Sequence, residues 1–204
     1  MKKNNTVQLP KFSDPEDKCD YGYETMQDFF LSWTLRCAED KYRKASVHVN
    51  ENARRAIFLL LYGHNTRDSF SFDKEIPNNF KVIRVEIKRQ KGGVDLVALI
   101  TVENGNGQTQ KFALNIENKY YSLLKEHQLK KNKTYVESNF PDYQVVSLFI
   151  TCDDSRKKIV YEQEKEWCRK AGYKFLTICD IANIMRDNKT GNDLFDEYWY
   201  REYE

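Results

Sequence analysis

The sequence lacks the features that mark membrane and secreted proteins. No stretch approaches the roughly 18 apolar residues that a membrane-spanning helix needs, and the longest apolar run, residues 56–62, predicts a buried core helix. The N-terminus has two lysines but no apolar segment after them, so no signal peptide is predicted. These absences predict a cytoplasmic protein.

Metal-binding and nucleotide-binding patterns are also missing. The chain has five cysteines, and no two have the CxxC spacing of a zinc knuckle. Their odd number and wide spacing argue against a disulfide scaffold and favour reduced thiols. The histidines form neither an HxH nor an HExxH pattern, and there is no GxxxxGK[ST] loop or GxGxxG fingerprint. The sequence therefore gives no support to a zinc site or a nucleotide-binding fold.

Neither sign of charge is in large excess. The 33 Lys and Arg residues oppose 31 Asp and Glu residues, for a net charge of +2, which neither requires nor excludes a nucleic-acid partner. The 204 residues, 14% of them aromatic, are enough for one sizeable core. We therefore predict a single domain over residues 1–204, with an irregular arm over 1–20, a core over about 50–180 and C-terminal helices over 179–203.

Hydrophobic periodicity predicts alternating helices and strands. The expected helices cover residues 23–43, 51–63, 121–137, 158–171, 179–187 and 191–203. The expected strands cover residues 82–87, 94–102, 111–117, 143–151 and 174–178. Asn50 is the predicted N-cap of the second helix, and turns are predicted at 88–93 and at the Asn-Gly-Asn-Gly segment 104–107. This order predicts an α/β (mixed α+β) fold, in which a central mixed sheet with a three-stranded meander is flanked by helices.

Three polar residues fall at the ends of two neighbouring strands. Asp95 begins the second expected strand, and Glu117 and Lys119 end the third. A hairpin can bring Asp95 close to Glu117, and the two-residue spacing puts Glu117 and Lys119 on one face. Paired carboxylates repel each other and are relieved by a hard cation such as Mg²⁺, to which the Asn118 carbonyl could add an oxygen. A metal-bound water and a lysine ammonium are the parts that phosphodiester hydrolysis requires, although the same residues also fit an exposed ion pair at a strand end.

The surroundings of these residues resemble a known family. The residues that show the resemblance are Gly-Val-Asp-Leu-Val at 93–97, Ala-Leu-Asn-Ile-Glu-Asn-Lys at 113–119, Gln128-Leu129 and Tyr135. Together they look like the PD-(D/E)XK nuclease superfamily, and more closely its bacterial branch with an Asp…Ile-Glu-Asn-Lys…Gln-Leu…Tyr pattern. The resemblance is firmest over 82–151 and departs from the pattern where Val94 replaces proline.

The resemblance implies a restriction-endonuclease-like fold and a Mg²⁺-dependent enzyme, with Mn²⁺ as a substitute. It implies a nucleic-acid substrate, DNA in preference to RNA, and leaves a homodimer or a recruiting partner protein open. It implies metal-binding roles for Asp95 and Glu117, and these two residues form the expected catalytic set together with Lys119 and Gln128. An acid on an N-terminal helix often completes such sites, and Glu51 is the candidate, although it equally fits a first-turn acid that favours the helix dipole.

Basic residues flank the expected site and could neutralise phosphates. They are Lys88, Arg89 and Lys91 on the first hairpin and Lys125, Lys130 and Lys131 on and near the following helix. A solvated face is the alternative. A competing register uses Asp73, Glu86 and Lys88, but residues 77–79 make a poor paired strand. Glu86 on the neighbouring strand is the alternative to Glu51 as the acid that completes the metal site. The functional alternatives to a nuclease are a non-catalytic binding module with the same fold, an enzyme that acts on a different substrate, and an unrelated α/β protein.

Overall fold

The computed structural model describes residues 23–66, 70–71, 76–119, 122–151, 158–185 and 189–201, and for residues 23, 24, 90, 91 and 201 the backbone alone. The expected arm over 1–20 lies outside this range. The helical segments are α1 (Tyr23–Cys37), η1 (Asp40–Tyr42), α2 (Val47–Tyr62), α3 (Glu126–Asn139), α4 (Lys158–Ala171), α5 (Ile178–Met185), α6 (Asp193–Asp196) and η2 (Glu197–Arg201). The strands are β1 (His64–Asn65), β2 (Phe70–Ser71), β3 (Lys81–Lys91), β4 (Val94–Glu103), β5 (Thr109–Lys119), β6 (Gln144–Thr151) and β7 (Lys174–Thr177).

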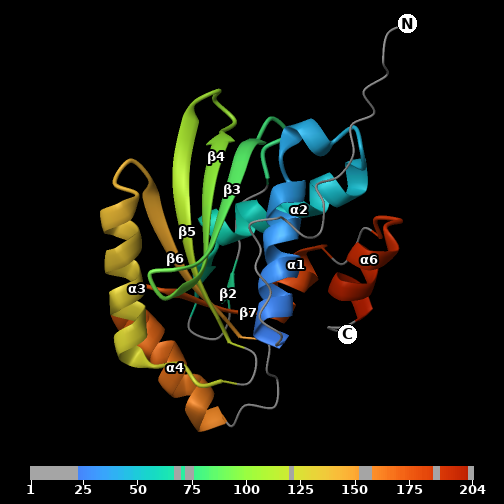
Figure 1. Cartoon of the computed structure of the whole chain (residues 1–204). Coiled ribbons are helices and arrows are strands. Elements are labelled where there is room, and N and C mark those ends of the chain that lie inside the picture. Colours follow the sequence, from blue (N-terminus) through green and yellow to red (C-terminus); the bar gives the residue numbers. More distant parts are fainter. Residues whose placement is uncertain are drawn as a thin grey trace, which may run out of the picture.

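A five-stranded mixed sheet in the order β3-β4-β5-β6-β7 forms the centre of the molecule. The first three strands are an antiparallel meander, and β6 and β7 then add in parallel. Helices α3 and α4 cover one face of the sheet, while α1 and α2 lie on the other (Figure 1). This arrangement confirms the predicted mixed α/β class with a three-stranded meander. Within the described residues, none of the helices combines the length and apolar character needed to span a bilayer.

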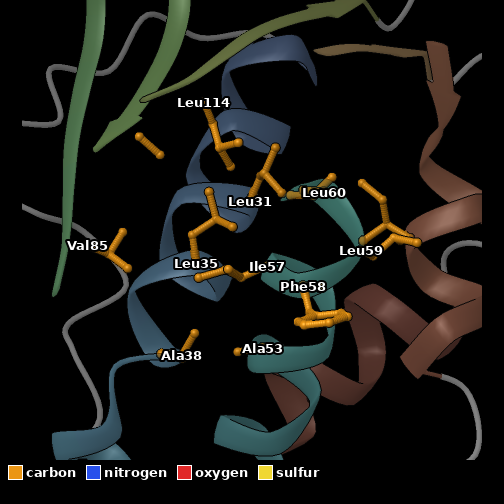
Figure 2. Close-up of a cluster of buried hydrophobic side chains, with 14 of the residues drawn as sticks. Leu31, Leu35, Ala38, Ala53, Ile57, Phe58, Leu59, Leu60, Val85 and Leu114 are labelled. Atoms are coloured by element: carbon orange, nitrogen blue, oxygen red, sulfur yellow. The ribbon is translucent and has the colours of Figure 1, made fainter. Parts of the chain in front are cut away.

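Strand alternation divides the buried side chains between the two faces. On β4 and β5, residues such as Leu96, Ile100 and Leu114 join the largest cluster. Helices α1 and α2 contribute Leu35 and Ile57 to it, and Figure 2 shows these two together with Leu114. A smaller cluster between α3 and the opposite face contains Val97, Ala113 and Val136, and a further one lies under α4. The core thus extends beyond residues 50–180, since helix α1 and the C-terminal segment belong to its largest cluster.

The second helix begins earlier than predicted, so the expected N-cap at Asn50 is wrong. Helix α2 is capped by Ser46, whose hydroxyl accepts from the Val49 amide. Asn50 lies inside the helix, fully buried, and its amide donates to the Cys37 and Glu39 carbonyls. Asn50 has the residue type of an N-cap, but its side chain instead forms tertiary hydrogen bonds that connect the end of α1 to α2.

Strand β3 is also longer than predicted. It continues to Lys91, so Lys88 and Arg89 lie in the strand, and only Gly92 and Gly93 make the turn. The predicted turn at 104–107 is confirmed. The Asn104 side chain accepts hydrogen bonds from the backbone amides of Asn106 and Gln108, and these bonds hold the loop in shape. A long β3 matters for the site, since the two ends of the sheet are well separated.

Candidate active site

The meander places the three predicted residues at one end of the sheet. The β4–β5 register pairs Leu96 with Ile116, so the next residues outward, Asp95 and Glu117, are neighbours. Glu117 and Lys119 lie on the face that α3 covers, as their two-residue spacing predicts. The parallel strands β6 and β7 end at the same level. Carboxyl ends of strands are where open α/β sheets usually bind ligands.

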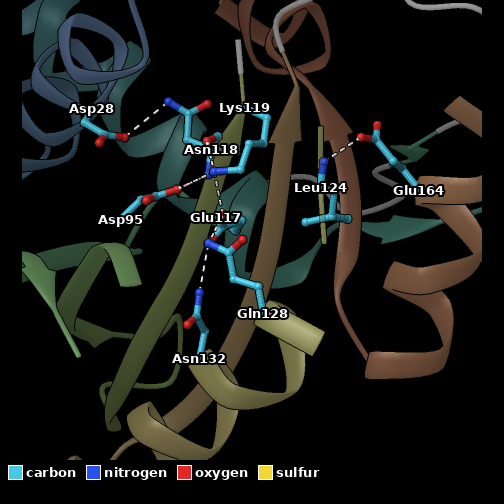
Figure 3. A network of polar contacts seen from close by, with 9 residues as sticks. All are labelled: Asp28, Asp95, Glu117, Asn118, Lys119, Leu124, Gln128, Asn132 and Glu164. Carbon is cyan, nitrogen blue, oxygen red and sulfur yellow. Dashed lines mark hydrogen bonds and ion pairs between the residues drawn. The ribbon is translucent and has the colours of Figure 1, made fainter. Parts of the chain in front are cut away.

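Three oxygen atoms converge on the ammonium group of Lys119 (Figure 3). The Nζ atom lies 2.6 Å from Glu117 Oε1 and 3.3 Å from Asp95 Oδ2. It also donates to the Asn118 carbonyl at 3.2 Å. Asp95 Oδ2 is held in turn by the Asn118 backbone amide at 3.1 Å. Two carboxylates and one backbone carbonyl therefore surround a single positive charge.

Helix α3 holds Glu117 from the other side. Gln128 Nε2 donates to Glu117 Oε1 at 2.6 Å, and Asn132 Nδ2 donates to Oε2 at 2.8 Å (Figure 3). Sequence reasoning identified Gln128 but missed Asn132. Asn132 could have been found from its position four residues after Gln128, because this spacing puts both side-chain amides on one face of the helix. Glu117 and Asn132 are both completely buried, so this contact belongs to the interior of the protein.

A third carboxyl group reaches the site from the opposite face of the sheet. Asp28 of α1 accepts from Asn118 Nδ2 at 3.2 Å (Figure 3). Because Asn118 points to the α1 face while Glu117 and Lys119 point to α3, the end of β5 links the two helix layers. Sequence reasoning missed Asp28. The available signal was an acid placed directly before Phe29 and Phe30 in a helix with a buried face.

The electrostatics of the site disfavour the ionised forms of two of its carboxyl groups. Burial raises the pKa of Glu117 to about 8, and the nearby charge of Asp95 adds to the rise while Lys119 opposes it. Burial likewise raises the pKa of Asp28 to about 7, again with a contribution from Asp95, against the opposing effects of Asn118, Arg89 and Lys119. Three carboxyl groups thus share two cationic side chains, and an additional cation would stabilise their ionised forms.

The structure does not bring Glu51 to this site, so the expectation that it completes a metal site is wrong. Its half-exposed side chain pairs with Arg43 at 3.3 Å. It shares a surface pocket with Arg54, which bonds to the Phe80 carbonyl just before β3 begins. Asp95 instead lies beside the last residues of β3. The 11 residues of that strand put about 30 Å between the two ends, at roughly 3.3 Å per residue.

The predicted phosphate-binding residues divide into two groups. Lys125, Lys130 and Lys131 are exposed on and beside α3, and Lys131 Nζ lies close to the Gly93 turn that precedes Asp95. On β3, Lys88 pairs with Glu86, and Arg89 lies over the Phe29 ring, 4.0 Å from its centre. The three lysines on and beside α3 therefore remain open to a phosphate, whereas Lys88 and Arg89 already have partners within the protein.

Two predicted residues fall outside what the structure describes. These are the Lys91 side chain and Asp73 of the competing register. The remaining acid of that register, Glu86, pairs with Arg84 and Lys88, and these ion pairs hold its pKa below the usual value. A low pKa indicates that the charge of Glu86 is already compensated, which distinguishes it from Asp28 and Glu117.

The oxygen set is compatible with a hard divalent cation. Across the described parts of the chain, no three His, Cys, Asp or Glu side chains form a metal-binding group. An ion bound at this site would have Asp95, Glu117 and the Asn118 carbonyl as its protein ligands, with water in the other positions. Mg²⁺ is commonly bound in this way, through one or two carboxylates and several waters.

Comparisons with known proteins give no further identification. The chain matches no family profile, no curated protein and no solved structure.

Proposed function

We propose that this protein is a metal-dependent nuclease of the PD-(D/E)XK type, with a restriction-endonuclease-like fold, that acts in the cytoplasm. The observation that carries the proposal is the convergence of Asp95, Glu117 and the Asn118 carbonyl on one cationic group. The raised pKa values of Glu117 and Asp28 support it, since burial and the charge of Asp95 make both ionised carboxylates unfavourable without a further cation nearby.

Each residue of the site has a distinct role in this proposal. Asp95, Glu117 and the Asn118 carbonyl hold Mg²⁺ or Mn²⁺, and Gln128 keeps Glu117 in place. When bound, such an ion lowers the pKa of a water and polarises a phosphoryl oxygen. Lys119 contributes an ammonium group that can orient the attacking water or stabilise charge on the phosphate.

Nucleic acid is the substrate that the surroundings of the site support. Lys125, Lys130 and Lys131 are exposed beside it, and each can neutralise a backbone phosphate without reading sequence. The resemblance to the nuclease family favours DNA over RNA. Because the described part of the chain has no separate recognition domain, we expect cleavage with low sequence specificity.

Cleavage of single- and double-stranded DNA and RNA, in Mg²⁺, Mn²⁺ or EDTA, tests the proposal. Lys119→Met and Glu117→Gln preserve side-chain size, and each should lower the rate by at least ~100-fold. Lys81→Met is the matched control, because Lys81 pairs with Glu103 at the opposite end of the sheet and should leave the rate unchanged.

A non-catalytic nucleic-acid-binding module is the second candidate. One observation favours it, namely that Lys119 already bridges both carboxylates, so that the cluster could serve stability alone. The absence of cleavage by folded wild-type protein, together with no effect of Mg²⁺ or Mn²⁺ on its thermal stability, would support the binding module and exclude the nuclease.

A further inference from the structure

The two carboxylate oxygens of Glu117 have different surroundings. Oε1 faces the centre of the site, where Lys119 Nζ and Gln128 Nε2 each approach to 2.6 Å. Oε2 accepts from Asn132 Nδ2 at 2.8 Å, on the side of helix α3 (Figure 3). Glu117 and Asn132 have no exposed surface, so water cannot easily replace this second contact.

The amide of Asn132 is oriented by Glu117. Its Oδ1 atom is buried and has no hydrogen-bond partner among the described residues. Rotation of the amide by half a turn would place this oxygen against the carboxylate and repel it. An unsatisfied buried acceptor is unfavourable, which indicates that the bond from Nδ2 to Glu117 determines the orientation of the side chain.

We propose that Asn132 is a specificity-determining residue, which holds Glu117 as a one-oxygen ligand and so favours Mg²⁺ and Mn²⁺ over Ca²⁺. This inference rests on the proposed metal-dependent function and names a selectivity for the same site. Ca²⁺ takes six to eight oxygen ligands and often uses both oxygens of a carboxylate. Mg²⁺ requires octahedral geometry and keeps several waters, so one oxygen of Glu117 is sufficient.

The preference for Mg²⁺ over Ca²⁺ arises because the contact between Glu117 and Asn132 is buried. To present both oxygens to an ion, Glu117 must turn its carboxylate and break the bond to Asn132. That movement leaves a buried amide donor unsatisfied in addition to the oxygen of the same side chain. The penalty for one buried unsatisfied group corresponds to a change in affinity of about tenfold, and it applies to an ion that needs both oxygens.

Thermal-shift titrations with MgCl₂, MnCl₂ and CaCl₂ test the inference without any need for catalysis. The variants are Asn132→Leu and Asn132→Ser, which both release Oε2 of Glu117. Each should lower the ratio of the Ca²⁺ to the Mg²⁺ dissociation constant by about tenfold. Asn52→Ala is the matched control, because this buried amide bonds to Tyr200, away from the site. It should lower the melting temperature and leave the ratio unchanged.

The outcomes separate the two proposals. Wild-type protein stabilised by Mg²⁺ or Mn²⁺, with a ratio that falls in either Asn132 variant and not in Asn52→Ala, supports the inference. If wild type binds Ca²⁺ as tightly as Mg²⁺, or if the ratio is the same in a folded Asn132 variant, the inference is overturned while the nuclease proposal stands. If no metal stabilises the wild type, both are overturned.

Discussion

Asp28 is the residue whose burial has the clearest consequence for stability. It is 4% exposed on α1, and its side chain accepts a hydrogen bond from Asn118. Burial raises its pKa from 3.8 to about 7, so the ionised form is unfavourable in the folded protein. A carboxyl group that is buried near Asp95, where its ionisation is unfavourable, is typical of a functional site.

We therefore expect Asp28→Asn to stabilise the metal-free protein at high pH. Between about pH 4 and pH 7 the folded protein keeps a proton that the unfolded chain releases, so wild-type stability falls as pH rises through this window. The advantage of the variant should be small near pH 4 and reach about 1–3 kcal/mol above pH 8. Thermal unfolding in EDTA measures it, with the exposed Asp193→Asn as control. An advantage that is equal at pH 4 and pH 8 would contradict the assignment.

Individual residues of the site were predictable where the chemistry is local in sequence. The spacing of Glu117 and Lys119, with Asp95 across a hairpin, could be recognised because strand alternation and hairpin pairing follow simple rules. Asp28 could not be recognised in this way, since its contact with Asn118 joins residues 90 positions apart. Glu51 was chosen for its place on a helix, and that place gives no information about which end of the sheet the helix approaches.

At the scale of elements, turns with dedicated residues were predicted better than helix ends. The loop after Asn104 has two Asn-Gly steps, and its conformation is determined by contacts within the loop. The start of α2 depends instead on whether Ser46 or Asn50 is the cap, and burial of Asn50 against Cys37 decides between them. Local turn chemistry is therefore readable in a sequence, whereas a choice between two possible caps depends on tertiary packing.

The β3–β4 turn packs closely against α3. Gly92 has a φ of 68°, and a Cβ atom there would lie 2.4 Å from the Tyr135 ring. Gly107 has a similar φ of 75° with nothing within 4 Å. Gly107→Ala should therefore cost about 1 kcal/mol for the left-handed backbone alone. Gly92→Ala should cost about 1–3 kcal/mol more, because the ring must move.

Urea unfolding of both glycine variants gives these values. Since Tyr135 lies on the same helix as Gln128 and Asn132, Gly92→Ala should also weaken stabilisation by Mg²⁺, and Gly107→Ala should not. Equal destabilisation by the two substitutions would show that the turn does not determine the position of α3.

At the scale of the whole molecule, the C-terminal segment completes the core on which α1 lies. Trp199 is fully buried, and its Nε1 donates to Thr34 of α1 at 3.0 Å. Tyr198 stacks on Phe30 with ring centres 3.8 Å apart. These contacts join residues more than 160 positions apart in the chain. The sequence predicted the C-terminal helices but not their partner, because amphipathic faces do not specify which surface they cover.

We expect Trp199→Ala to destabilise the entire protein rather than its C-terminus alone. Removal of a fully buried tryptophan lowers the free energy of unfolding by about 3–5 kcal/mol. The Thr34 hydroxyl of α1 also loses the hydrogen bond from Trp199. Urea unfolding followed by circular dichroism measures the loss, with Leu194→Ala as the control, since Leu194 is 46% exposed in the same segment and should cost less than about 0.5 kcal/mol. Because α1 carries both Thr34 and Asp28, loosening the helix should also reduce the dependence of stability on pH that Asp28 confers. A Trp199→Ala variant that unfolds at the wild-type urea concentration would show that the C-terminal segment is dispensable for α1, and the link between this segment and the site would then be wrong.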